Sequence, residues 1–218
     1  MTPSAQSHRP ARLAAALLAA VLLLLAWSAI RPHDYETWIL EVFPALLGIG
    51  VLLATYRRFP LTPLAYTLIA IHAAVLIVGG HYTYALVPIG TWFQEHFHLS
   101  RNHYDRLGHF VQGFVPAVIA REVLIRNQVV RRGWWLVFIV LAICMGISAC
   151  YELVEWAVAQ IDSGGSTAFL GTQGDVWDTQ EDMAMCGVGA IVSLAVLSRW
   201  HDRQIMLSAR ASAAPPAR

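Results

Sequence analysis

An aspartate and a histidine stand four residues apart at the start of an apolar segment. They are Asp105 and His109, within the stretch NHYDRLGHF at residues 102–110, and the apolar segment continues to about Ile125. A spacing of four residues places both side chains on one face of a helix. Because ionisable groups are costly in lipid, we expect this face to point into the protein and to form part of a functional site.

Further ionisable side chains are predicted to join this pair, and all of them lie where apolar segments begin or end. Carboxylate oxygens with one or two imidazoles suit a divalent cation such as magnesium, manganese, calcium or zinc, and these ligand types alone do not choose among the four. The predicted metal ligands are His81, Asp105, His109, Glu152, Asp175, Asp178 and Asp182.

The same groups without a metal would act as general acids and bases. The predicted catalytic residues are Asp105, His109, Glu152 and Glu155. In this interpretation His109 is the best ligand or base, Asp105 is its orienting or ligand partner, and Glu152 is the second acid/base group.

Simpler roles are open for several of these residues. Asp178 and Asp182 can each take part in capping the last helix, whose positive dipole end favours acids. Arg101 or Arg106 can neutralise a glutamate in a structural ion pair. Glu152 is harder to explain in this way, because it lies near the C-terminal end of its helix, where the dipole disfavours negative charge.

The composition is that of a polytopic membrane protein. Of the 218 residues, 57% are hydrophobic and 13% are charged, and the mean hydropathy is +0.53. We predict an all-α bundle of six transmembrane helices over residues 13–200, with polar tails at 1–12 and 201–218, the second of them flexible. The first apolar run exceeds the roughly 7 to 15 residues of a signal-peptide core, so we expect it to be a retained helix. The predicted spans are 13–30, 36–56, 61–80, about 102–125, 134–159 and 183–200.

Six spans place both termini on one side of the membrane, and the arginines indicate which side. Lysine is absent, and with cytoplasmic termini twelve of the fifteen arginines fall on the inner side. This distribution predicts a bacterial inner-membrane protein with both ends in the cytoplasm. Twelve of the fourteen acids fall on the outer side, and Glu122 and Asp202 are the exceptions. Acids contribute little to orientation, so the outer carboxylates need another explanation.

Helix rise predicts that the ionisable groups reach one level. Glu152 lies eighteen residues after Trp134, which is about 27 Å in a hydrocarbon core roughly 30 Å thick. With Trp134 at the inner face, Glu152 lies just inside the outer boundary, near the level of Asp105. We therefore expect four helices to form one outward-facing site.

Three separated motifs resemble those of a known family. NHYDRLGHFVQGFVPA, YELVEWA and FLGTQGDVWDTQEDMAMCGVGA follow one another in this order on six spans. On these motifs the chain is identified as a member of the YjdF family of bacterial inner-membrane proteins, over roughly residues 35–200. The resemblance implies an inner-membrane location and supplies no catalytic assignment.

The chain is more distantly similar to VanZ-like proteins. These have Asp-Lys-x-x-His-Phe, then a Glu-containing helix, then Asp-x-x-Asp-x-x-x-Asn-x-x-x-Gly. Arg106 stands in place of the lysine and Asp182 in place of the asparagine, and Gly187 comes one position late. The similarity implies a role with envelope lipids or cell-wall precursors. The matching residues are Asp105, His109, Phe110, Glu152 or Glu155, Asp175, Asp178 and Gly187.

These observations favour hydrolysis or transfer on a lipid-linked envelope substrate at the outer leaflet. The expected partners are membrane lipids and that substrate, with no nucleic acid. The alternative is a non-enzymatic protein for membrane binding, assembly or small-molecule passage. Passage is less favoured, because the inner half of the bundle offers few ionisable groups beyond His72. A purely structural polar network is the third interpretation.

Overall fold

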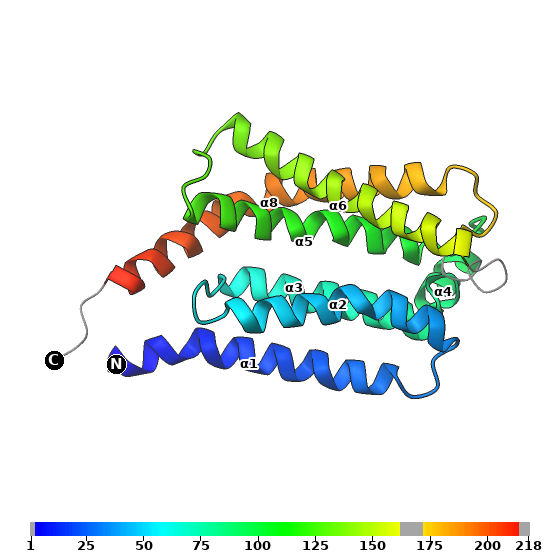
Figure 1. Ribbon diagram of the computed structural model, residues 1–218, viewed down its shortest axis with the longest axis horizontal. Helices are drawn as coiled ribbons and strands as arrows, with labels where there is room; N and C mark the ends of the chain where they lie inside the picture. The colour runs from blue at the N-terminus through cyan, green and yellow to red at the C-terminus, as the bar shows by residue number, and fades with distance from the viewer. Residues whose placement is uncertain (1–2, 162–171, 214–218) are drawn as a thin grey trace.

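The chain folds into a bundle of long helices (Figure 1). The computed structural model describes residues 3–161 and 172–213, and no strand occurs within them. The predicted all-α fold is therefore confirmed. Within the described ranges, six helices are long and apolar enough to cross a membrane. They are α1 (Pro3–Ser28), α2 (Tyr35–Thr55), α3 (Pro63–Tyr82), α5 (Tyr104–Arg126), α6 (Trp134–Ile161) and α8 (Asp178–Ala213).

Polar side chains start α2 and α3. Asp34 Oδ2 accepts a hydrogen bond from the backbone N–H of Thr37 at 2.7 Å, and this bond lowers the pKa of Asp34. At α3, Thr62 Oγ1 accepts from the N–H of Ala65 at 3.4 Å. Pro63 follows at the first helical position, where a backbone N–H would have no partner within the helix.

The bundle consists of two groups of three helices. α1 and α2 both pack against α3, whereas α5, α6 and α8 pack against one another, and α3 joins the two groups through α5. Figure 1 shows the first group below the second. The most extensive contact is between α5 and α8. It brings Asp105 and His109 of α5 beside the first turns of α8.

The two ends of the bundle differ in their polar residues. The start of α1 and the end of α8 lie at one end, which we call the terminal end (Figure 1). The opposite end, where α2, α5 and α8 begin, is the acidic end. Between α3 and α5, the 3-10 helix η1 (Tyr84–Leu86) and the short helix α4 (Pro88–His96) lie at the acidic end. Trp92, Phe93 and Phe97 are exposed there, as is typical of a segment at a membrane interface.

α5 and α8 approach closely because glycines lie at their contact. A Cβ atom added at Gly113 would lie 1.8 Å from the backbone oxygen of Cys186. One added at Gly189 would lie 2.0 Å from the backbone oxygen of Phe110. Small residues at close crossings are typical of membrane helix pairs. Neither position can hold a side chain unless the helices separate.

We expect Gly113→Ala to destabilise the protein by about 1–3 kcal/mol, because α5 must move away from the α8 backbone. Gly50→Ala on α2 is the matched control, since a Cβ there meets nothing within 4 Å. Thermal unfolding of the detergent-purified variants compares the two. A melting temperature of Gly113→Ala equal to that of the wild type would show that the α5–α8 spacing is not needed.

A buried polar cluster at the terminal end ties three helices together. The Glu122 carboxylate of α5 accepts hydrogen bonds from the backbone N–H and hydroxyl of Thr62 at 2.9 and 2.7 Å, and from Arg126 Nη1 at 2.7 Å. His201 Nε2 of α8 lies 3.0 Å from the same carboxylate. Glu122, Thr62 and His201 are fully buried. The negative charge also complements the positive end of the α3 dipole.

The last helix extends beyond its predicted end at residue 200. α8 continues to Ala213, so it includes residues 201–213 of the segment that the sequence placed in the C-terminal tail, while 214–218 lie outside the described residues. Its polar side chains have partners on the neighbouring helices. Gln204 Oε1 accepts from the N–H of Leu64 at 2.9 Å, and Asp202 accepts from Arg121 Nη2 at 2.7 Å. Hydropathy predicts only where the apolar span ends. These hydrogen bonds and ion pairs stabilise the polar helical segment that follows it.

Candidate metal and acid/base site

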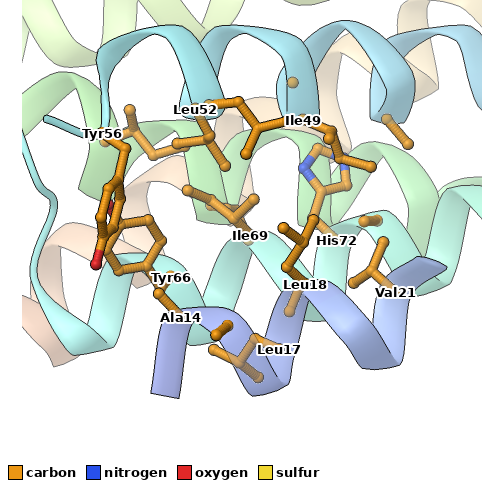
Figure 2. Close-up of a pocket in the computed structure, with 18 of the residues that line it drawn as sticks. Ala14, Leu17, Leu18, Val21, Ile49, Leu52, Tyr56, Tyr66, Ile69 and His72 are labelled. Atoms are coloured by element: carbon orange, nitrogen blue, oxygen red, sulfur yellow. The ribbon is translucent and has the colours of Figure 1, made fainter. Parts of the chain in front are cut away.

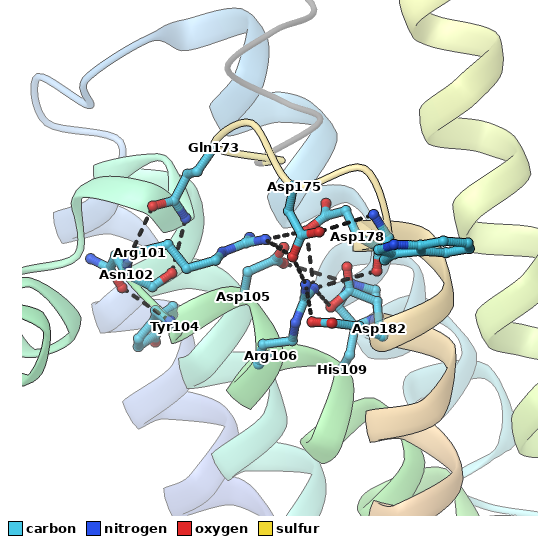
Figure 3. A network of polar contacts seen from close by, with 12 residues as sticks. Arg101, Asn102, Tyr104, Asp105, Arg106, His109, Gln173, Asp175, Asp178 and Asp182 are labelled. Carbon is cyan, nitrogen blue, oxygen red and sulfur yellow. Dashed lines mark hydrogen bonds and ion pairs between the residues drawn. The ribbon is translucent and has the colours of Figure 1, made fainter. Parts of the chain in front are cut away.

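Three ionisable side chains meet between α5 and α8 at the acidic end (Figure 3). His109 Nε2 lies 3.6 Å from Asp105 Oδ1 and 3.8 Å from Asp182 Oδ2. One ligand atom from each of the three residues lies within 4.8 Å of the other two. Their side chains are 13% exposed or less. Two carboxylates and an imidazole at this spacing form a candidate site for a divalent cation.

The other nitrogen of the imidazole faces different groups. His109 Nδ1 lies 3.0 Å from Gln112 Oε1 and 3.7 Å from Glu152 Oε1. Donation from Nδ1–H to Gln112 leaves the lone pair of Nε2 directed toward the two aspartates, which is the arrangement that a metal ligand needs. Glu152 Oε1 is buried and has no hydrogen-bond partner among the described residues.

Two arginines contact the aspartates on the side away from His109. Asp182 Oδ1 accepts from Arg106 Nη1, and Asp105 Oδ2 lies 3.8 Å from Arg101 Nη2. Each aspartate therefore has one oxygen near an arginine and the other oxygen near His109. The arginines offset part of the negative charge without covering the oxygens that face Nε2.

The remaining aspartates of this end also contact the arginines. Asp178 Oδ1 lies 3.0 Å from Arg106 Nη1, and Asp175 Oδ2 lies 3.2 Å from Arg106 Nη2. Arg101 Nη1 contacts both aspartates as well. The backbone N–H of Trp177 donates to Asp175 Oδ1 at 2.9 Å. This bond and the two arginines lower the pKa of Asp175.

A cavity of about 130 Å³ adjoins the site. The hydroxyl of Tyr151 on its wall donates to Glu41 Oε2 at 3.3 Å. Tyr84 also lines it, and burial raises the pKa of that phenol, as does the nearby Glu41. The cavity has room for several water molecules or a small polar group. Its ionisable lining residues are Glu41, His72, Tyr84, Asp105, His109, Tyr151 and Glu155.

Comparison with known proteins places this bundle in a family. A family model described as "Predicted membrane protein (DUF2238)" matches residues 13–203. The chain is 51% identical to the inner membrane protein YjdF of Escherichia coli strain K12 over 183 residues, which is 84% of this chain and 88% of the relative. The chain belongs to the YjdF family. The resemblance inferred from its motifs is confirmed, and the protein is an inner-membrane protein with several membrane-spanning helices. No solved structure is significantly similar to it.

In this YjdF-family chain the predicted site residues fall into three sets. Asp105, His109, Glu152 and Asp182 meet around the imidazole, and Glu155 lines the adjoining cavity. Asp175 and Asp178 contact Arg101 and Arg106. His81 lies elsewhere: its Nδ1 is 2.9 Å from the backbone oxygen of Ser28, and its ring packs against Trp27 of α1.

Arg106 forms an ion pair with a glutamate, which is one of the simpler roles that the sequence left open. It contacts Glu181 at 2.9 Å, in addition to the aspartates of α8. The reason is local, because Arg106 lies in the first turn of α5, which packs beside the first turn of α8. Glu152 and Glu155 come from the far end of α6 and meet the imidazole and the cavity.

Two further residues of the candidate site were not predicted from the sequence. Gln112 lies three residues after His109 on the same helical face and contacts its ring. Glu41 is buried within α2 and brings a third carboxyl-bearing helix to the cavity, beside α5 with Asp105 and α6 with Glu155. The signal for Glu41 was present, since it is an acid inside an apolar span.

Proposed function

We propose that this inner-membrane protein binds a divalent cation between Asp105, His109 and Asp182, and performs acid/base chemistry on an envelope lipid or cell-wall precursor. The observation that carries the proposal is the convergence of His109 Nε2 with one oxygen of each aspartate. Gln112 Oε1 lies within hydrogen-bond distance of the opposite nitrogen and the Glu152 carboxylate lies 3.7 Å from it, where second partners of a metal-binding histidine commonly lie.

The charge balance of the acidic end supports a cation. Among the described residues, eight carboxyl groups lie in or beside the site, whereas the guanidinium groups that contact them are those of Arg101 and Arg106. Buried carboxylates without an opposite charge are costly, so bound cations or protons are needed to offset them. The eight acids are Glu41, Asp105, Glu152, Glu155, Asp175, Asp178, Glu181 and Asp182.

In this proposal, different residues of the chain have different chemical roles. A bound cation would polarise a carbonyl or phosphoryl oxygen of the substrate. Glu155 and Glu41 line the cavity and can give or accept a proton at a substrate atom that lies there. Tyr151 donates to Glu41 and fixes its carboxylate. Glu41 and Glu155 are buried, as are Asp105 and His109, and this burial keeps bulk water from competing for these groups.

The orientation belongs to the same proposal: both termini lie in the cytoplasm and the acidic end faces outward. The arginine-rich connections between α2 and α3 and between α5 and α6 are both at the terminal end. At the acidic end, Arg101 and Arg106 are engaged in ion pairs. The positive-inside rule therefore supports a cytoplasmic terminal end.

Metal content tests the proposal. After equilibrium dialysis against each divalent cation, wild-type protein in detergent should hold near-stoichiometric metal by elemental mass spectrometry. His109→Ala should hold almost none, and Glu152→Ala should lose affinity by about 10–100-fold because the imidazole loses an orienting partner. His81→Ala is the control, since His81 contacts Ser28, and it should keep its metal. Equal metal in the wild type and His109→Ala would contradict the site.

A second candidate is a non-enzymatic binding, assembly or passage protein. The observation that favours it is the cavity volume of about 130 Å³, since small-molecule sites commonly measure about 300–1,000 Å³. Turnover separates the two candidates. Purified protein that releases product from an envelope lipid extract, and loses this activity in Glu155→Gln, is an enzyme. Stoichiometric metal without turnover would favour the binding protein.

A further inference from the structure

A second and larger cavity lies between α1, α2 and α3 (Figure 2). Its volume is about 470 Å³, within the range of small-molecule sites. α1 and α2 both pack on α3 but make few contacts with each other, which leaves the space between them. The lining is almost wholly apolar and includes Leu18, Val21, Ile49, Leu52 and Ile69.

The apolar cavity adjoins the cavity of about 130 Å³ beside the candidate site, which we call the carboxylate cavity. Pro44, His72 and Leu76 line both of them. Along α2 the combined lining runs from Glu41 to Tyr56, which is fifteen residues or about 22 Å. One membrane leaflet contributes about 15 Å of hydrocarbon. The two adjoining cavities together are thus polar at the acidic end and apolar toward the terminal end, and their combined lining along α2 is longer than one leaflet is deep.

We propose that the apolar cavity holds the hydrocarbon chain of a membrane lipid whose polar group lies in the carboxylate cavity. The inference rests on the proposed function and names its substrate class. Only a molecule with a polar end and a long apolar part matches both linings. His72 stands at the junction, where the polar part of such a molecule gives way to hydrocarbon. The smaller cavity then has to hold only the reacting atoms of the head group.

Two glycines of α2 provide a matched test. Gly48 lines the apolar cavity, whereas Gly50 does not, and a Cβ at either position meets nothing within 4 Å. A phenylalanine at position 48 therefore fills the cavity without a backbone clash. A phenylalanine at position 50 adds the same side chain outside the cavity and controls for folding and for helix propensity.

The probe is a phospholipid with a photoreactive diazirine near the end of one acyl chain, present in trace amounts in nanodiscs of phosphatidylethanolamine and phosphatidylglycerol. After irradiation, peptide mass spectrometry should find adducts at Leu18, Ile49 or Ile69 in the wild type and in Gly50→Phe. These adducts should fall about tenfold in Gly48→Phe, which corresponds to about 1.4 kcal/mol of lost affinity.

Metal content of the same samples separates this inference from the proposed function. Gly48→Phe should keep its metal, because Gly48 does not line the carboxylate cavity. Adducts at the lining residues in a protein without metal would support the lipid cavity and overturn the metal site. Equal adducts in both phenylalanine variants would overturn the lipid cavity. The lipid cavity would also be overturned if the wild type gave no adducts and formed a dimer that Gly48→Phe abolishes. In that case a second copy of the chain would fill the cavity.

Discussion

Replacement of Glu122 by alanine should lower the free energy of unfolding by about 3–5 kcal/mol. The Glu122 carboxylate accepts from Thr62 at the start of α3 and from Arg126, and it contacts His201 of α8. Removal of the carboxylate leaves the two Thr62 donors and His201 without this acceptor and opens a void, while Arg126 keeps its hydrogen bond to the backbone oxygen of Pro60 at 2.6 Å. Buried donors without partners, together with a guanidinium that has lost its carboxylate, make this one of the most costly substitutions in the chain.

Reversible unfolding in mixed detergent measures the effect. Glu122→Gln should have an intermediate effect, because one amide oxygen still accepts while the amide nitrogen faces other donors. Glu95→Ala removes an exposed acid at the acidic end and should change stability by less than about 0.5 kcal/mol. A Glu122→Ala variant as stable as Glu95→Ala would show that the terminal-end cluster does not hold the three helices together.

The sequence predicted the spans well because the bilayer imposes them. A helix must present about twenty apolar residues to cross the hydrocarbon core, and the runs that end at Arg57 and begin at Trp134 are of this kind. The level of Glu152 and Asp105 followed from helix rise alone. In the structure both carboxylates lie beside His109, so the distance along each helix was enough to predict their depth in the membrane.

Helix rotation was not predictable in the same way. Lipid is as apolar as a protein core, so an apolar side chain does not show which face is buried. On α6, Leu153 and Trp156 are exposed, while Glu152 and Glu155, each directly before one of them in the sequence, are buried. His81 illustrates the limit, since it lies at the expected helix end but faces Ser28 of α1. Its rotation depends on the packing of α1 against α3, which no local pattern encodes.

The arginine network lay outside prediction for a related reason. Arg101 precedes α5, and its contacts with Asp175 and Asp178 join segments more than seventy residues apart. Charge counts indicated that acids at this end need a partner, but they did not say which acids contact arginine and which face His109. The answer depends on the α5–α8 contact, which Gly113 and Gly189 make close.

Arg106→Met should be about as destabilising as Glu122→Ala, by about 3–5 kcal/mol. The Arg106 guanidinium is buried and contacts the carboxylates of Asp175, Asp178, Glu181 and Asp182. Without it, Asp182, which is 1% exposed, lacks its main opposite charge. Unfolding in mixed detergent with a chelator present measures the loss. Arg57→Met, at an exposed arginine of the terminal end, should leave stability nearly unchanged.

The double variant Arg106→Met/Asp182→Asn shows whether the cost comes from the orphaned charge. Removal of both partners of a buried pair is much less harmful than removal of one, so the double variant should recover part of the stability that Arg106→Met loses. If the two losses simply added, Arg106 would act through packing or its other carboxylate partners and not through Asp182. A divalent cation should also stabilise Arg106→Met more than the wild type, because at the proposed site the ion contacts the second oxygen of the same aspartate. The arginine network and the proposed metal site therefore share Asp182. A change in the free energy of unfolding on adding the cation thus reports on both.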